Sequence, residues 1–430
     1  MEKFFQFKER QTTYKKETLA GITTFLSMAY ILVVNPIILS QSGMDQGAVF
    51  TATALSAIVG TLLIGILANF PIGIAPSMGL NSFFTFSVCI GMGIKWEVAL
   101  TGVFVAGIIF VILSLFKIRE KIINAIPQDL KFAIAGGIGF FVAFVGLKNA
   151  GIIVSNEATF VSIGDLTSPL TALAVIGFVI TVLMLVRGIH GAIFYGMVIT
   201  TIIGMIIGLI DAPSSIVGTI PSLEPTFGVV FSNLDQILSP QLLAVVFTFL
   251  FVAFFDTAGA LIAVASQAGL MKNNEIPNIG RALLADSTSG VVGAVLGTST
   301  TASFVESSAG IAVGGRTGFT SVIISACFAV ALFFSPILSV ITPEVTAPAL
   351  IIVGALMSME ISKINWGKIE VVIPSFVTII MMPLTYSVAT GIALGFILYP
   401  LALLSQKRYR EVHPIMYVLA ILFACYFIFV

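Results

Sequence analysis

The sequence predicts an all-α polytopic membrane protein, with about 14 transmembrane helices arranged as a 7+7 inverted repeat. Its composition, the spacing of its apolar segments and the placement of its basic residues predict this fold. Of the 430 residues, 58% are hydrophobic and 9% are charged, and the mean hydropathy is +1.12. Soluble domains carry roughly 25% charged residues, so lipid has to cover side chains of this composition. The net charge of zero gives no sign of a nucleic-acid partner.

Apolar stretches recur along the whole chain. A helix that crosses the bilayer needs about 20 apolar residues, and membrane β-barrels show weaker, alternating segments, so helices are expected here. The expected spans are 18–39, 48–69, 72–93, 98–116, 130–148, 169–186, 191–210, 240–265, 283–297, 300–314, 319–340, 346–360, 370–385 and 387–405. A further apolar stretch, 414–430, follows the last of these spans.

Basic residues cluster before the first span and after each even-numbered span. The clusters are Lys3, Lys8, Arg10, Lys15 and Lys16; Lys117, Arg119 and Lys121; Arg187; Lys272; Arg316; Lys363 and Lys368; Lys407, Arg408 and Arg410. Lys95 and Lys148 are exceptions to this alternation. Since lysine and arginine in short loops favour the cytoplasm, we expect a multi-pass protein of the cell (inner or plasma) membrane with a cytoplasmic amino terminus.

A polar, proline-containing connection divides the expected spans into two halves. Residues 1–210 would form the first repeat, 211–239 a periplasmic or extracellular connection, and 240–405 the second repeat. An odd number of spans in each half gives the halves opposite orientations, as in many secondary transporters. Residues 406–430 would form an extra carboxyl-terminal hydrophobic segment.

Two corresponding spans are interrupted by small and polar residues. The third reads PIGIAPSMGLNSFFTFSV and contains Asn81; the tenth reads GTSTTASFVESSAGIAVGG and contains Glu306. Paired broken spans point to a binding site at the membrane midplane, where helix ends present unpaired backbone groups and a dipole end. Close helix packing by small residues is the alternative explanation, but the polar side chains favour a site.

Three acids lie within apolar runs, namely Asp256, Asp286 and Glu306. A carboxylate in a bilayer is costly and usually functional. Because desolvation favours its neutral form, such a group can carry a proton, and as an anion it can accept N–H donors of a heterocycle. An interhelical hydrogen bond is the structural alternative, and it stays open most for Asp286, near Arg281 and the end of its span.

No pattern indicates a metal, a cofactor or an enzyme. The histidines, His190 and His413, lie near segment ends, and the three cysteines form no ligand-like pair. The string GGIGF around Gly137 lacks the preceding strand of a phosphate-binding loop. Buried acids without a fixed cation also argue against an anionic substrate.

The strings APSMGLNSFF, FFDTAGAL and TASFVESSAGIAVGGRTG resemble the nucleobase–cation symporters of the uracil/xanthine permease type. Within that family, the chain is similar to the azaguanine-like adenine/guanine/hypoxanthine permease branch over nearly its whole length. The resemblance implies a core domain of spans 1–4 and 8–11 and a gate domain of spans 5–7 and 12–14, which would move in an elevator-like manner.

The resemblance also implies import of a purine nucleobase, guanine or hypoxanthine first, by proton symport. The substrate-binding residues would be Asn81, Asp256, Thr257, Glu306 and Ser307, and the proton-coupling residues Asp256, Asp286 and Glu306.

The chain departs from relatives at two positions of span eight, Ala253 and Ala260, where relatives carry polar groups. Both positions bear on the proton path. An adenine permease of the same branch, or an anion exchanger of the sulfate/bicarbonate type with the same fold, remains as an alternative. The hydroxyl-rich start of span ten keeps sodium coupling open, and the sequence leaves a homodimer open as well.

Overall fold

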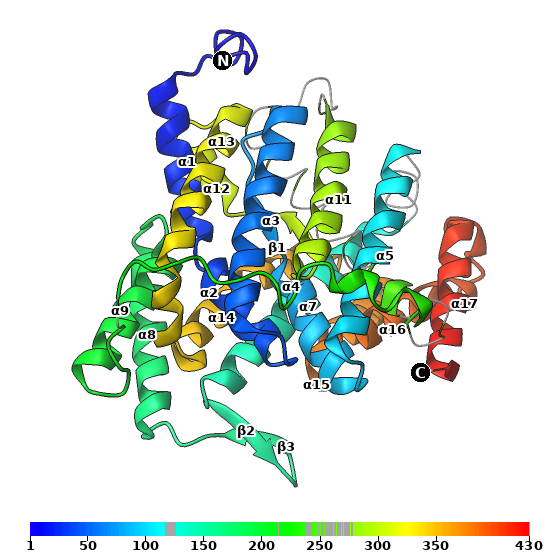
Figure 1. Cartoon of the computed structure of the whole chain (residues 1–430). Coiled ribbons are helices and arrows are strands. Elements are labelled where there is room, and N and C mark those ends of the chain that lie inside the picture. The colour runs from blue at the N-terminus through cyan, green and yellow to red at the C-terminus, as the bar shows by residue number, and fades with distance from the viewer. Residues whose placement is uncertain are drawn as a thin grey trace.

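The computed structural model describes residues 1–116, 126–213, 215–236 and 278–429, with isolated positions between 239 and 276. It is a helix bundle, which confirms the all-α membrane fold (Figure 1). Within the described ranges, nine helices are long and apolar enough to cross a membrane, and four apolar helices are shorter. Span 240–265, with Asp256 and Thr257, lies largely outside the described residues. The count of 14 spans stays a prediction.

The first half of the chain contains the elements up to the central connection. They are α1 (Tyr14–Met28), α2 (Ile31–Ser40), α3 (Gln46–Leu67), β1 (Ile74–Pro76), α4 (Met78–Ser82), the π-helix η1 (Phe83–Gly91), α5 (Trp96–Leu115), α7 (Gln128–Asn149), β2 (Ile153–Asn156), β3 (Phe160–Ile163), α8 (Pro169–Val186) and α9 (Ala192–Ile206). The connection carries two short 3-10 helices, η2 (Val229–Phe231) and η3 (Leu234–Gln236).

The second half repeats the motif of a short strand followed by a short helix. Its elements are α11 (Ile279–Leu296), β4 (Thr301–Ser303), α12 (Ser307–Ala312), α13 (Gly318–Ala331), η4 (Leu332–Val340), α14 (Pro343–Ser358), η5 (Met359–Lys363), α15 (Ile369–Leu384), α16 (Val388–Ser405), η6 (Tyr409–Glu411) and α17 (Pro414–Phe429). Strand β4 and helix α12 thus correspond to β1 and α4 of the first half.

Glycines allow helices of the two halves to approach closely. A Cβ on Gly318 would overlap the carbonyl oxygen of Gly65 on α3, and a Cβ on Gly354 of α14 would overlap that of Gly139 on α7. Small residues at such crossings let helices pack without the hydrophobic driving force that water provides. The glycines of this sequence therefore have two roles, since they allow close helix packing and also interrupt the two broken spans.

A β-hairpin between α7 and α8 is an element that the search for apolar spans misses. Strands β2 and β3 pair antiparallel, with Asn156 opposite Phe160 at the turn. The Asn156 side chain accepts hydrogen bonds from the backbone N–H groups of Ala158 and Thr159, an Asx-type turn that stabilises the reversal. The hairpin and the amino terminus lie at opposite ends of the bundle (Figure 1), as the expected orientation requires of a loop after an odd-numbered span.

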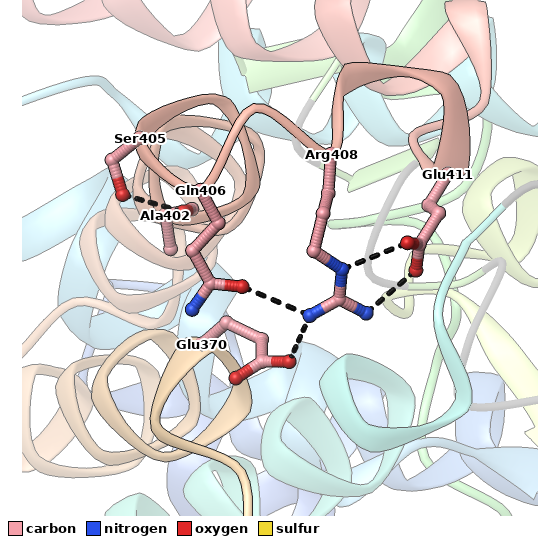
Figure 2. Close-up of polar contacts among 6 residues, drawn as sticks. All are labelled: Glu370, Ala402, Ser405, Gln406, Arg408 and Glu411. Atoms are coloured by element: carbon pink, nitrogen blue, oxygen red, sulfur yellow. Dashed lines mark hydrogen bonds and ion pairs between the residues drawn. The ribbon is translucent and has the colours of Figure 1, made fainter.

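An arginine cluster holds the turn between α16 and α17 (Figure 2). The Arg408 guanidinium forms a two-pronged contact with Glu411, at 2.8 and 2.6 Å, and also donates to Glu370 and Gln406. The hydrogen bond from Arg408 lowers the pKa of the Glu411 carboxyl. This cluster ties the start of α15 to the turn between α16 and α17, although ion pairs near the surface contribute little stability individually.

Glu17 organises the opposite, amino-terminal end of the bundle. Its carboxylate is fully buried and accepts five hydrogen bonds, from the backbone N–H groups of Arg316, Thr317 and Thr320 and from both threonine hydroxyls. The last two residues belong to the start of α13, where the helix dipole favours an anion. Arg10 adds hydrogen bonds to the carbonyls of Asn69 and Arg316, both at 2.8 Å. These contacts hold the polar amino-terminal segment against two loops of the bundle.

We expect Glu17→Ala to destabilise the protein strongly. The substitution leaves five buried donors without their acceptor, and removal of one partner from a buried charged network costs about 3–5 kcal/mol. Thermal unfolding in detergent and abundance in the membrane measure the effect. Glu9→Ala, at an exposed position, is the matched control, and equal unfolding temperatures for the two variants would contradict the role of Glu17.

Candidate functional site

The two broken spans cross at the centre of the bundle, where their strands pair. Strand β1 runs antiparallel to β4, with Ala75 opposite Ala302, and all residues of both strands are buried. Two flanking hydrogen bonds extend the ladder, from Phe304 N to Gly73 O at 2.9 Å and from Ser77 N to Thr300 O at 3.0 Å. Each span thus supplies the backbone partners that the interrupted helix of the other lacks.

Span three presents buried polar atoms just after this ladder. Asn81 in α4 is fully buried, and its side-chain oxygen accepts a hydrogen bond from Ser299. In the described part of the chain, the Asn81 Nδ2 and the hydroxyls of Ser82 and Thr85 have no hydrogen-bond partner. A buried polar atom without a partner costs about 1–3 kcal/mol, and π-helices such as η1 often occur at functional sites. This cluster is therefore a candidate to bind a ligand or water.

Span ten places Glu306 immediately before the first turn of α12. Its side chain is half-buried, and Oε1 accepts a hydrogen bond of 2.6 Å from the hydroxyl of Tyr30. Tyr30 lies between α1 and α2, so the first span contributes to the same region. The neighbouring Ser307 is fully buried, and its hydroxyl accepts a hydrogen bond of 3.0 Å from Gly73 N. Ser307 therefore joins the two broken spans.

Asp286 approaches the crossing from α11. Its side chain is 2% exposed and accepts a hydrogen bond of 3.3 Å from Ser303 of β4. One helical turn away, the hydroxyls of Ser289 and Thr301 lie 2.6 Å apart. A small cavity borders this carboxylate, and its lining includes Phe249, Ala253, Ser287, Thr300 and Thr301. The position beside β4 supports a role at the site for Asp286.

The structure places three of the predicted site residues, Asn81, Glu306 and Ser307, on the two broken spans, and a fourth, Asp286, beside them on α11. The other two, Asp256 and Thr257, lie outside the described residues, but Ala253 of the same expected span lines the cavity beside Asp286. Within the parts that are described, no group of three or more His, Cys, Asp and Glu side chains could hold a metal ion.

Sequence reasoning did not assign three polar residues of the crossing to the substrate site, although Ser299 belongs to the hydroxyl-rich start of span ten. Tyr30 bonds Glu306, Ser299 bonds Asn81, and Asn35 of α2 donates to Thr53 and Thr298 at 2.7 and 2.9 Å. A signal was present in the sequence. Tyr30 and Asn35 are the polar residues of the apolar run 28–39, and the hydroxyl-bearing residues 298–300 directly precede strand β4. No motif distinguishes such residues from polar residues that only form hydrogen bonds between helices.

Tyr386, in the turn between α15 and α16, connects span three to α7. Its ring lies at centroid distances of 5.4 Å from Phe86 on η1 and 5.5 Å from Phe141 on α7. Ser87 donates a hydrogen bond of 3.0 Å to its carbonyl oxygen. The residue has a positive φ of 55°, which is unusual for a bulky side chain. Tyr386 thus joins span three to α7 by edge-to-face aromatic contacts and by the hydrogen bond from Ser87.

The fold and the site together define a class. Apolar helices long enough to cross a membrane surround two broken spans that pair at the centre, and buried or half-buried carboxylates and amides line the crossing. This is the construction of a multi-pass secondary transporter with inverted repeats.

The particular family follows from comparison with known proteins. The profile of the xanthine and uracil permeases, described as Permease family, matches residues 15–394. The chain belongs to this family. It is 56% identical to the guanine/hypoxanthine permease PbuG of Bacillus subtilis (strain 168), with 100% of both chains covered. It is 40% identical to the adenine permease AdeQ of Escherichia coli (strain K12), with 99% of this chain and 95% of the relative covered.

A solved structure gives independent support for the fold. The transmembrane domain of the cyanobacterial bicarbonate transporter BicA superposes with a TM-score of 0.65, over 89% of this chain and 97% of that one. The sequence identity is 17%. The likeness therefore confirms the architecture of the inverted-repeat transporter and leaves the substrate to the site itself.

We expect Ser299→Ala to destabilise the protein by about 1–3 kcal/mol, because the fully buried oxygen of the Asn81 amide loses the hydroxyl that donates to it. Thermal unfolding of the purified protein measures the change. Ser405→Ala is a matched control, since the exposed Ser405 hydroxyl only donates to the Ala402 carbonyl of its own helix (Figure 2). A Ser299 variant as stable as this control would show that the contact adds nothing to the fold.

Proposed function

We propose that this protein imports purine nucleobases across the cell membrane, with guanine and hypoxanthine as its main substrates. The observation that carries the proposal is the 56% identity to a guanine/hypoxanthine permease over the full length of both chains. The amino terminus would face the cytoplasm, as the distribution of basic residues predicts.

The chemistry of the crossing supports a polar, neutral heterocycle. The Asn81 Nδ2 is a buried donor without a described partner, and Glu306 is a half-buried acceptor. A purine such as guanine offers both carbonyl acceptors and N–H donors at its edges. A carboxylate can accept two of these N–H groups at once. We assign substrate binding to Asn81, Asp256, Thr257, Glu306 and Ser307.

Adenine is the second candidate, because the chain is also 40% identical to an adenine permease. The likeness to a bicarbonate transporter concerns the fold alone at 17% identity, and a carboxylate at Glu306 would repel an anion. We therefore rank adenine second and place anion exchange last.

We infer an elevator-like movement of a core domain (spans 1–4 and 8–11) against a gate domain (spans 5–7 and 12–14). Glycine contacts support both units, with Gly65 against Gly318 in the proposed core and Gly139 against Gly354 in the proposed gate. The edge-to-face contact of Tyr386 with Phe86 would lie between the units, and an aromatic contact can shift at smaller cost than a hydrogen-bonded network can rearrange.

Glu306→Gln tests the site. We expect it to reduce uptake of labelled guanine and hypoxanthine by at least about 100-fold, because the amide replaces one of the two acceptor oxygens by an NH₂ donor and cannot carry a proton. The protein should still reach the membrane, which immunoblotting of membranes verifies. Glu360→Gln, at an exposed ion pair with Lys363, is the control. Uptake near the normal rate in the Glu306 variant would remove Glu306 from the site.

A comparison of two acids tests the assignment of their roles. We expect Asp256→Asn to impair uptake more strongly than Asp286→Asn. Asp256 lies in the middle of a long apolar run, whereas Asp286 is hydrogen-bonded to Ser303 behind the strand ladder. Initial uptake rates, normalised to abundance in the membrane, decide the order. An inactive Asp286 variant beside an active Asp256 variant would exchange the two roles.

Protons are the proposed coupling ion, carried by Asp256, Asp286 and Glu306. A carboxylate that faces the acidic exterior takes up a proton, and it releases the proton when it faces the cytoplasm. We expect an uncoupler to abolish accumulation of the purine and an acidic shift of the external medium to increase it. Replacement of external sodium by choline should have no effect. Accumulation that requires sodium and ignores the uncoupler would establish sodium coupling instead.

A further inference from the structure

Tyr30 is a buried phenol within the first membrane span. It lies at the junction between α1, which ends at Met28, and α2, which begins at Ile31, and its backbone angles remain helical. The residue is 1% exposed. A buried phenol normally needs a hydrogen-bond partner, and here the partner is a carboxylate on one of the two broken spans.

We propose that Tyr30 is the positioning residue of Glu306. Its hydroxyl donates to Glu306 Oε1 at 2.6 Å, a length typical of a strong, charge-assisted O–H···O⁻ bond. Because this hydrogen bond fixes the position of one carboxylate oxygen, it also sets the orientation of the carboxylate toward the substrate. The inference rests on the proposed function, because it gives Tyr30 a role only if Glu306 binds the purine.

Close packing surrounds this pair. A Cβ on Gly310 of α12 would overlap the Thr24 hydroxyl of α1 and would lie 2.5 Å from the Ala20 carbonyl oxygen. A Cβ on Gly73, beside β1, would lie 2.5 Å from the Met28 sulfur. The glycines thus let α1 approach both broken spans closely. This packing supports a unit in which Tyr30 and Glu306 move together and keep their hydrogen bond through the transport cycle.

This reasoning separates Tyr30 from a gate residue. A gate residue would break its contact during each cycle, and its loss would change the maximal transport rate. A positioning residue acts on the geometry of the bound purine in every state. Its loss therefore weakens binding and leaves the rate of the conformational change nearly unaltered.

Tyr30→Phe isolates the hydroxyl, since the ring and its packing are kept. We expect the Kd of the purified protein for guanine and the KM for uptake to rise about tenfold, while the maximal rate per transporter stays within about twofold. The unfolding temperature without substrate should fall, because the half-buried carboxylate loses a donor, so the effect on binding is compared on folded protein only.

Two control variants are measured beside Tyr30→Phe. Tyr399→Phe removes a phenol hydroxyl from the partly buried Tyr399 of α16. Thr24→Val removes a buried hydroxyl that has no hydrogen-bond partner among the described residues and that lies where α1 contacts α12. Both should bind guanine with normal affinity. Direct binding is measured on equal amounts of folded protein, so a lower yield of Tyr30→Phe does not obscure the result.

An unchanged Kd and KM in Tyr30→Phe, beside a strong effect of Glu306→Gln, would overturn the inference and leave the proposed function intact. A lower maximal rate with normal KM would also overturn it, in favour of a gating role. If the unaltered protein binds none of guanine, hypoxanthine and adenine, the proposed function fails, and the inference falls with it.

Discussion

The constraint on which this structure depends is the need of every backbone polar group for a partner inside the membrane. Two spans give up their helical hydrogen bonds at the centre of the bundle, and strands β1 and β4 replace them by pairing with each other. The pairing fixes where α4 and α12 begin, and with them the positions of Asn81 and Glu306. The first span and α11 then pack on this pair and add Tyr30 and Asp286.

The buried polar groups fall into two kinds that residue type does not distinguish. Glu17 is fully buried and saturated by five donors from α13 and the loop before it, which is a structural role. Asn81, Ser82 and Thr85 are equally buried, yet each keeps an atom without a partner in the described chain. Elsewhere, helical threonines such as Thr181 and Thr200 donate to their own helix, and single hydroxyls without a described partner, such as that of Thr24, occur on other helices. The gathering of three such atoms at span three favours a ligand there.

Much of the architecture could be predicted from the sequence because long apolar runs indicate membrane-spanning helices. The described helices lie at the expected spans, and both broken segments contain a strand and a short helix. The hairpin of β2 and β3 was missed because its signal is a local Asx turn at Asn156. The Tyr30–Glu306 and Ser299–Asn81 contacts join residues more than 200 positions apart, and no local pattern encodes such pairs. Glu17 was missed because it lies in a polar, basic segment, where a buried side chain is not expected.

The central claim is that the crossing of the two broken spans is the purine site. Hydrogen–deuterium exchange of the purified protein, with and without guanine, tests it most directly, because a bound ligand stabilises the segments that contact it. The account predicts slower exchange in residues 76–85 and 299–308 and unchanged exchange in α17. Protection confined to other helices, with both broken spans exchanging as before, would contradict it.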